Sequence, residues 1–266
     1  MKIVLLGAGK LAHHLGPAFV EKGIEIVAVY NRSLDRARQL APRLGGDVMV
    51  TDRLFELPKD ADFYLLAVAD QAIAELARQL SGHLGPNLPL VHTSGATPSE
   101  VLRIASSRYG VFYPFQSFSP GRKIDFEQIP LSIYSQDQEL LALLRAVAEK
   151  LSRQVYRLDD QQRAQLHVAG VFANNFVNHL IGQSHDLLAK ANIPKPILFN
   201  LIRETIEKLE QQDADSAQTG PAIRGDSVTI EKHLALLDTN PAARAVYQLI
   251  TQQIKSTNST NQQIAK

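Results

Sequence analysis

The sequence contains no cysteine. This absence excludes disulfide bonds, thiolate metal sites and a cysteine nucleophile. An excess of charge of one sign is also missing, because 28 Lys and Arg residues nearly balance 27 Asp and Glu residues in a chain of 266 residues. A nucleic-acid-binding protein needs a positive face for phosphates, so a net charge of +1 without a basic block argues against nucleic acid as a partner.

Long hydrophobic runs are absent as well. No apolar stretch approaches the roughly 20 residues that a membrane-spanning helix needs. The opening run "IVLL" ends at Gly7, which is too short for the apolar region of a secretory signal, about 7–15 residues. We therefore expect no membrane partner and a cytoplasmic protein.

Short apolar runs alternate with helical segments through about the first 155 residues. Most runs are apolar at consecutive positions, which is typical of strands covered on both faces. The runs lie at residues 2–6, 25–30, 47–50, 63–68, 89–92 and 110–113, and the helical segments at residues 11–22, 34–44 and 71–80. This alternation predicts an α/β fold with a parallel, doubly wound sheet. A further unit of residues 130–135, 138–150 and 154–158 extends the predicted sheet.

Helical periodicity dominates the second half of the chain. Asp159 and Gln162 form a capping box, and the pattern then continues to about residue 191, where "ANIPKP" stops it. Further helices are predicted at residues 197–212, 229–237 and 242–254. We expect a sheet domain over residues 1–157, an all-α domain over residues 158–256, and a frayed polar tail over residues 257–266.

The stretch "GAGKLA", Gly7 to Ala12, follows the first predicted strand and opens the first predicted helix. Gly7 permits a tight turn, Gly9 lets backbone N–H groups approach a pyrophosphate, and Ala12 lets the helix pack closely on the strand. The helix N-terminus adds partial positive charge. A glycine turn without a ligand is the alternative. The candidate cofactor contacts here are Gly7, Ala8, Gly9, Lys10 and Leu11.

The end of the second predicted strand indicates which dinucleotide binds. NAD sites usually place an acidic residue there, but this chain has Asn31, Arg32 and Ser33. An arginine and a hydroxyl can hold a 2′-phosphate, which a carboxylate would repel. Ser33 is also placed to cap the helix that follows. An exposed arginine at a helix start is the alternative, and we predict NADP.

Small residues end two later strands. In an open parallel sheet, ligands lie beyond the carboxyl ends of the strands, so Ala67, Val68 and Ala69 are expected at the nicotinamide side. Thr93 and Ser94 offer hydroxyls nearby, and Ser94 is a candidate cofactor contact. Capping of their own loop is an equally good interpretation. His92 is ambiguous, because a histidine at a strand end is often structural.

The long predicted helix after residue 159 carries a polar stripe. At about 100° per residue, His167, Asn174, Asn178 and His185 fall in one sector. The apolar residues point elsewhere, toward a core: Ala169, Phe172, Ala173, Phe176 and Leu180. Polar groups on an apolar helix need partners or a ligand, so the stripe is either a solvated face or a site. Two histidines without a carboxylate stripe predict no metal site.

The segment "TGPAIRGD", Thr219 to Asp226, pins a specific turn. Asp226 is placed to cap the next helix. Arg224 has the forked donors that clamp a carboxylate or phosphate. It is also suited to hold a helix end or a neighbouring subunit, and we favour a loop that faces the cleft.

These motifs together resemble a family of Rossmann-like NADP oxidoreductases whose helical C-terminal part is a domain of unknown function. The resemblance covers nearly the whole chain and rests on the phosphate loop, "NRS", "LAVADQAI", "VHTSGA", "FYPFQSFS", "HVAGVFANNFVNHL" and "TGPAIRGD". It implies relatedness to pyrroline-5-carboxylate reductases, deazaflavin-dependent NADP reductases and β-hydroxyacid dehydrogenases, with no established substrate. β-Hydroxyacid dehydrogenases carry a catalytic lysine four residues before an asparagine on the equivalent helix. Matching "VFANN" to that pattern places Asn175 at the asparagine and Val171 at the lysine.

The first hypothesis is therefore an NADP-dependent reductase of a small C=O or C=N substrate. His167, the nearest titratable replacement for the lysine, donates a proton. Asn175, with Asn174 beside it, positions the substrate, and Arg224 holds an anionic substituent. The second hypothesis is an NADP-binding regulatory or assembly protein without turnover. The apolar helix predicted over residues 166–188 suggests a homodimer formed through the helical domain.

Overall fold

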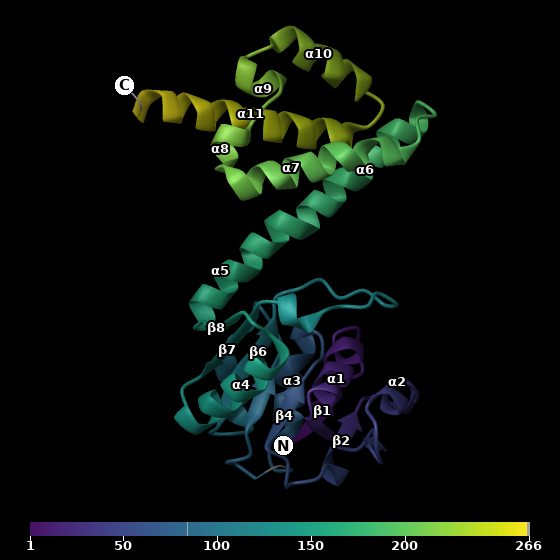
Figure 1. Ribbon diagram of the computed structural model, residues 1–266, viewed down its shortest axis with the longest axis vertical. Helices are drawn as coiled ribbons and strands as arrows, with labels where there is room; N and C mark the ends of the chain where they lie inside the picture. Colours follow the sequence, from purple (N-terminus) through teal and green to yellow (C-terminus); the bar gives the residue numbers. More distant parts are fainter. Residues whose placement is uncertain (84, 265–266) are drawn as a thin grey trace. The chain divides into compact units, whose positions relative to one another are not determined.

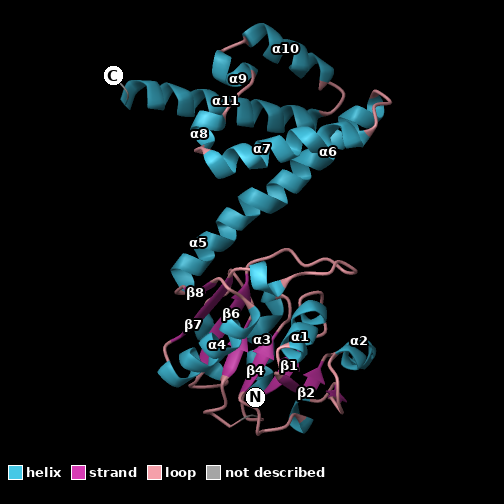
Figure 2. Cartoon of the chain, in the orientation of Figure 1, coloured by secondary structure: helices cyan, strands magenta, loops and turns pink. Residues whose placement is uncertain are grey.

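The computed structural model describes residues 1–83 and 85–264, and its contacts divide the chain into two units, Met1–Asn174 and Asn175–Lys266. Figure 1 shows the order of the elements along the chain. The first unit contains the sheet, and the second is helical (Figure 2).

One eight-stranded sheet forms the centre of the first unit, in the order β3-β2-β1-β4-β5-β6-β7-β8. The strands are β1 (Lys2–Leu6), β2 (Glu25–Tyr30), β3 (Met49–Thr51), β4 (Phe63–Leu66), β5 (Leu90–His92), β6 (Tyr109–Pro114), β7 (Leu131–Ser135) and β8 (Val155–Arg157). All neighbouring pairs are parallel except β6 and β7, which are antiparallel. The predicted doubly wound α/β fold is confirmed.

The direction of β7 differs from the fully parallel prediction. A parallel neighbour needs a crossover connection, usually a helix. Between Pro114 and Leu131, the structure has only the short 3-10 helix Phe126–Gln128. The chain therefore turns back, and β7 pairs antiparallel with β6.

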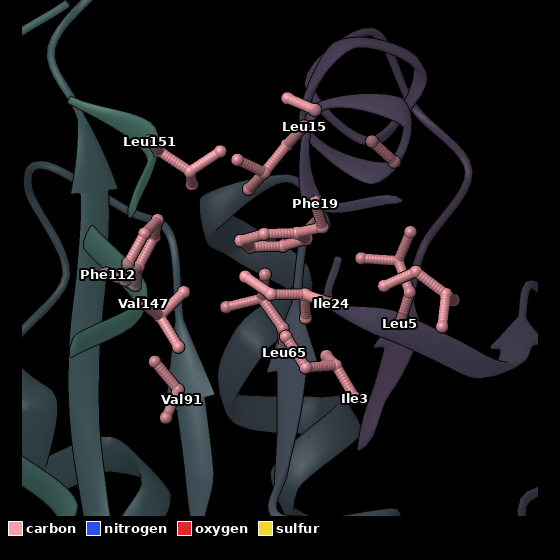
Figure 3. Packing of buried hydrophobic residues seen from close by; sticks show 14 of the residues in the cluster. Ile3, Leu5, Leu15, Phe19, Ile24, Leu65, Val91, Phe112, Val147 and Leu151 are labelled. Atoms are coloured by element: carbon pink, nitrogen blue, oxygen red, sulfur yellow. The ribbon is translucent and has the colours of Figure 1, made fainter. Parts of the chain in front are cut away.

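Apolar side chains cover both faces of this sheet. Along β1, Ile3 and Leu5 lie in one buried cluster, whereas Val4 and Leu6 lie in a second. Figure 3 shows part of the first cluster, in which Phe19 approaches Phe112 with 5.9 Å between ring centroids. Burial on both faces explains why the strands are continuously apolar. The helices of this unit are α1 (Ala12–Glu21), α2 (Leu34–Leu40), α3 (Asp70–Leu80), α4 (Gln138–Leu151) and α5 (Asp160–Gly170).

Helix α5 begins at the predicted capping box. Asp159 accepts a hydrogen bond from the Gln162 amide, and the Gln162 side chain accepts from the Asp159 amide. The sequence did not predict the π-helical segment Val171–Phe176 that separates α5 from α6 (Val177–Lys190). A π segment adds residues to a turn, so a fixed 100° step cannot relate His167 to residues beyond Gly170. The division between the units falls inside this segment. The domain boundary predicted after residue 157 stays a prediction.

The second unit continues from α6 through five further helices in its described part. These are α7 (Phe199–Gln211), α8 (Ala214–Ala217), α9 (Pro221–Arg224), α10 (Ser227–Leu236) and α11 (Pro241–Ile264). Asp226 caps α10 as predicted, accepting from the Thr229 amide at 3.0 Å. Helix α11 extends beyond the predicted end at Ile254. The predicted tail therefore coincides with helix up to Ile264, and residues 265 and 266 lie outside the described residues.

Two aromatic side chains expected in a core are exposed instead. Phe172 is 64% exposed and Phe176 48% exposed. Helical periodicity identified an apolar stripe but could not identify the surface that covers it. None of the described helices is long and apolar enough to span a bilayer.

Candidate functional site

The turn after β1 brings the backbone against the end of β4. Gly7 has a φ of 117°, which favours glycine, and its amide donates to the Tyr30 carbonyl at 2.7 Å. A Cβ at Gly7 would collide with the Ala67 carbonyl oxygen. The turn therefore requires glycine for both conformation and space, as expected for a dinucleotide-binding loop.

Helix α1 opens toward this turn with features that suit an anion. Its N-cap, Leu11, makes no side-chain capping hydrogen bond, and its first turn has no acidic residue. Lys10 and Gly9 are exposed, whereas Ala12 is fully buried. Backbone N–H groups at a helix start attract phosphate, so the residues present here fit a pyrophosphate.

Asn31 joins the turns after β1 and β2. Its Oδ1 accepts from the Ala8 amide at 3.2 Å, and its Nδ2 donates to the Ser33 carbonyl at 2.9 Å. In this arrangement Asn31 braces the loop. Ser33 occupies the N-cap of α2, but its hydroxyl makes no capping hydrogen bond, contrary to the expectation.

A groove of about 590 Å³ gathers most of the predicted cofactor contacts. The predicted residues that line it are Gly7, Ala8, Gly9, Asn31, Arg32, Ala67, Val68 and Ala69. Lys10 instead lines an adjoining hollow that shares Ala8 and Gly9 with this groove. Leu11, Ser33 and Ser94 line neither of these two cavities.

Arg36 lines both cavities and was not predicted from the sequence. It lies in the first turn of α2, which begins at Leu34 after Arg32 and the extended N-cap Ser33, so no regular helical spacing relates it to Arg32. A groove with two guanidinium groups beside a phosphate-type loop suits an anionic dinucleotide.

The loop after β5 is bonded mainly to itself. The Ser94 hydroxyl accepts from the Ala96 and Thr97 amides at 3.2 and 2.9 Å, and Thr93 donates to the Leu66 carbonyl at 3.1 Å. These bonds agree with the loop-capping interpretation of both hydroxyls. A contact between Ser94 and a cofactor stays a prediction.

His92 is fully buried at the end of β5, and its Nδ1 accepts from the Ser94 amide at 3.1 Å. Burial, with a smaller contribution from the nearby Arg163 charge, lowers the pKa of His92 to about 4. A neutral, buried imidazole that supports a loop has a structural role.

His167 lies at the same edge of the sheet. Its Nδ1 is 3.1 Å from the hydroxyl of Tyr113, which is the penultimate residue of β6. It also lies against Gly95, the residue after Ser94. Helix α5 therefore brings His167 beside the carboxyl ends of β5 and β6. Tyr113 was missed from the sequence, because no local pattern relates a strand residue to a helix residue 54 positions later.

The other predicted catalytic residues belong to other elements. Asn174 and Asn175 are in the π-helical segment, on either side of the division between the units. Arg224 ends helix α9 in the second unit, is exposed, and its charge is one of the smaller causes that lower the pKa of Asp226. Their substrate-binding roles stay predictions. Among the described residues, no group of three histidine or acidic side chains could hold a metal.

Two family models match the chain. Residues 129–254 match a domain of unknown function, DUF2520, and residues 1–82 match the shikimate/quinate 5-dehydrogenase model. The second match spans the Gly7 turn, β2 and β4.

Known proteins resemble the chain over different lengths. The candidate NADP oxidoreductase BF3122 of Bacteroides fragilis is 40% identical, with a TM-score of 0.88 over 96% of this chain and 98% of that one. A reductive aminase of Aspergillus terreus, solved with NADPH, is 15% identical, with a TM-score of 0.70 over 96% and 92% of the two chains, and shares the fold. Glutamyl-tRNA reductase of Methanothermobacter marburgensis is 41% identical over 66 residues, which are 25% of this chain and only 17% of that protein.

Proposed function

The chain belongs to a family of Rossmann-like NADP oxidoreductases with a helical C-terminal domain of unknown function, and from this premise we propose that it is an NADPH-dependent reductase of a small C=O or C=N compound. One observation carries the proposal: a single groove is lined by the Gly7–Gly9 turn, by Arg32 and Arg36, and by Ala67–Ala69. The bound cofactor supplies the hydride.

The choice of NADP(H) rests on charge at the end of β2. Arg32 and Arg36 line the groove, and no carboxylate occupies positions 31–33. A 2′-phosphate accepts charge-assisted hydrogen bonds from guanidinium groups. We assign Arg32 to that phosphate, with Ser33 as a hydroxyl donor and Arg36 as a second cation. Lys10 and Leu11 lie at the pyrophosphate.

Residues of α5, the π-helical segment and α9 have the proposed roles of proton donor and substrate binding. His167 donates the proton, and its position beside the carboxyl ends of β5 and β6 supports this role. Asn174 and Asn175 hold the polar group of the substrate, in a type of segment that is frequent at functional sites. Arg224 binds an anionic substituent.

A homodimer buries the apolar side chains that the second unit exposes. Helix α7 alone exposes Phe199, Leu201, Ile206 and Leu209 by 40% or more. Exposed apolar surface of this kind marks interaction sites, and most oligomers pair identical chains. We propose that a second copy of the chain covers this surface.

A panel of imines and 2-oxo acids tests the proposal through NADPH consumption. The wild type should turn over at least one compound, and His167→Ala should lower kcat by about 10²–10⁴ with NADPH affinity unchanged, as expected for a general acid. Val171 at the lysine position favours a second candidate, an NADP-binding protein without turnover. NADPH binding without consumption across the panel would establish that alternative.

A further inference from the structure

The contact between Tyr113 and His167 is specific in its geometry. The Tyr113 hydroxyl and His167 Nδ1 are 3.1 Å apart, and the two rings are tilted with centroids 6.2 Å apart. Both residues belong to the unit Met1–Asn174. The hydrogen bond occupies one ring nitrogen of the histidine and leaves Nε2 as the atom that can exchange a proton with a substrate.

Gly95 makes room for this pair. A Cβ at position 95 would lie 2.6 Å from His167 Nδ1, 2.7 Å from Tyr113 Cζ and 2.8 Å from the Tyr113 hydroxyl oxygen. Any other residue would therefore push the two rings apart. Gly95 has no positive φ, so the requirement for glycine at this position is space rather than backbone conformation.

Arg163 ties the helix that carries His167 to the loop that carries Gly95. It lies one turn before His167 on α5, is fully buried, and donates from Nε to the Ser94 carbonyl at 3.1 Å and from Nη2 to the Thr97 carbonyl at 2.6 Å. The loop that carries Gly95 is thus tied to the helix that carries His167. Groups held in this way keep a precise geometry without reorganising during a reaction.

The pair lies at the functional edge of the sheet. The parallel register places Leu66 beside His92 and His92 beside Val111, so the ends of β4, β5 and β6 are neighbours. Burial raises the pKa of Tyr113, with a smaller contribution from the Asp70 carboxylate and an opposing one from Arg163. The phenol therefore keeps its proton at neutral pH and remains both a donor and an acceptor.

We propose that Tyr113 is a positioning residue that orients His167 in both of its protonation states. This inference rests on the proposed reductase function. With a neutral imidazole, the phenol O–H donates to Nδ1; with an imidazolium, Nδ1–H donates to the phenol oxygen. In the reduction, a hydride from the reduced nicotinamide dinucleotide forms a C–H bond. The π electrons of the C=O or C=N bond move to the oxygen or nitrogen, which takes the proton from Nε2 of the imidazolium. The imidazole is left with a proton on Nδ1, which donates to the phenol oxygen until Nε2 regains a proton from water. The bound dinucleotide would supply the two electrons and be oxidised.

Ring ¹⁵N spectra of the full chain test the pairing without a substrate. Tyr113→Phe keeps the ring and removes the hydroxyl, and Tyr109→Phe on the same strand is the matched control. When the His167 imidazole is neutral, the wild type should have its proton on Nε2, Tyr113→Phe should give a mixture of tautomers, and Tyr109→Phe should match the wild type. Unchanged His167 signals in Tyr113→Phe would overturn the proposal.

Steady-state kinetics with a C=O or C=N compound that the wild type reduces test the role of the pairing. Tyr113→Phe should lower kcat by about 10–100-fold, the usual cost of losing an orienting partner, and change the KM for NADPH by less than about twofold, since the phosphate loop is intact. Gly95→Ala should act similarly, whereas Gly182→Ala, with open space around it, should not.

In a His167→Ala background, Tyr113→Phe should have no further effect on kcat. A loss equal to that seen in the wild-type background would refute the pairing. A wild type without turnover would contradict the proposed function, and the ¹⁵N spectra would still decide whether the pair exists.

Discussion

Apolar side chains fill both faces of the sheet in the unit Met1–Asn174, whereas the unit Asn175–Lys266 buries few of its own. The buried apolar residues in the described part of the second unit are Ala222, Ile230, Leu237 and Ala243. A residue type alone therefore does not predict its contribution to stability. The first unit has a packed core beside the groove proposed to hold the cofactor, and the second unit has exposed apolar surface.

A matched pair of leucine substitutions tests this difference most strongly. Leu65 is fully buried in β4 and Leu201 is 65% exposed in α7. Leu65→Ala should lower the free energy of unfolding by about 2–5 kcal/mol, because it leaves a cavity in a packed core. Leu201→Ala should change it by less than about 0.5 kcal/mol at concentrations where the chain is monomeric. Urea unfolding of both variants measures the two changes in the free energy of unfolding. Equal losses of stability would contradict the expected difference.

Acid should act on the first unit through His92. Its folded-state pKa of about 4 lies below the ordinary value of 6.5, so the unfolded chain binds more protons between these values. The contribution of neutral His92 to the free energy of unfolding is therefore fully present above pH 6.5. It falls by on the order of 3 kcal/mol as the pH drops toward 4. His92→Asn should reduce this dependence, whereas the exposed control His83→Asn should retain it. A wild-type stability that is flat over this range would contradict the account.

Among the residues proposed to bind the 2′-phosphate, Arg32 should contribute most to the preference for NADPH. Arg32→Ala should weaken NADPH binding by about 1.5–3 kcal/mol, the usual value of a hydrogen bond to a charged group, and leave NADH binding unchanged. Arg38→Ala is the control, because Arg38 is exposed on α2 and pairs with Asp35. Calorimetric titration of both cofactors measures the effect. Equal affinities of the wild type for NADPH and NADH would reject the assignment.

The smallest expected effect concerns the second unit. Leu201→Glu places a carboxylate in the exposed apolar face of α7 and should raise the dissociation constant of a homodimer at least tenfold, about 1.4 kcal/mol. Glu207→Gln on the same helix is the control, since it removes a charge from an exposed position. Light scattering over a range of concentrations gives the constants. A monomeric wild type at micromolar concentration would exclude the dimer.

The sequence predicts the parts of this molecule that depend on local pattern. Continuous apolar runs identified the strands because both faces of the sheet are covered, and the Gly7 turn was predicted because only glycine satisfies its backbone. The Asp159–Gln162 cap was predicted because its bonds are local.

Features that depend on distant contacts were missed. The reversal of β7 follows from a connection without a crossover helix, and the π-helical segment shifts the phase of the helix at Gly170. The Tyr113–His167 contact and the buried Arg163 arise from packing between residues far apart in the chain. Periodicity carries no information about either.

A crystal structure of the chain with NADPH would show whether the dinucleotide lies in this groove. We expect the pyrophosphate on the backbone of Gly9, Lys10 and Leu11, the 2′-phosphate on Arg32, and the nicotinamide ring beside Ala67–Ala69. Continuous electron density for NADPH away from the groove, or an empty groove at saturating NADPH, would contradict this expectation.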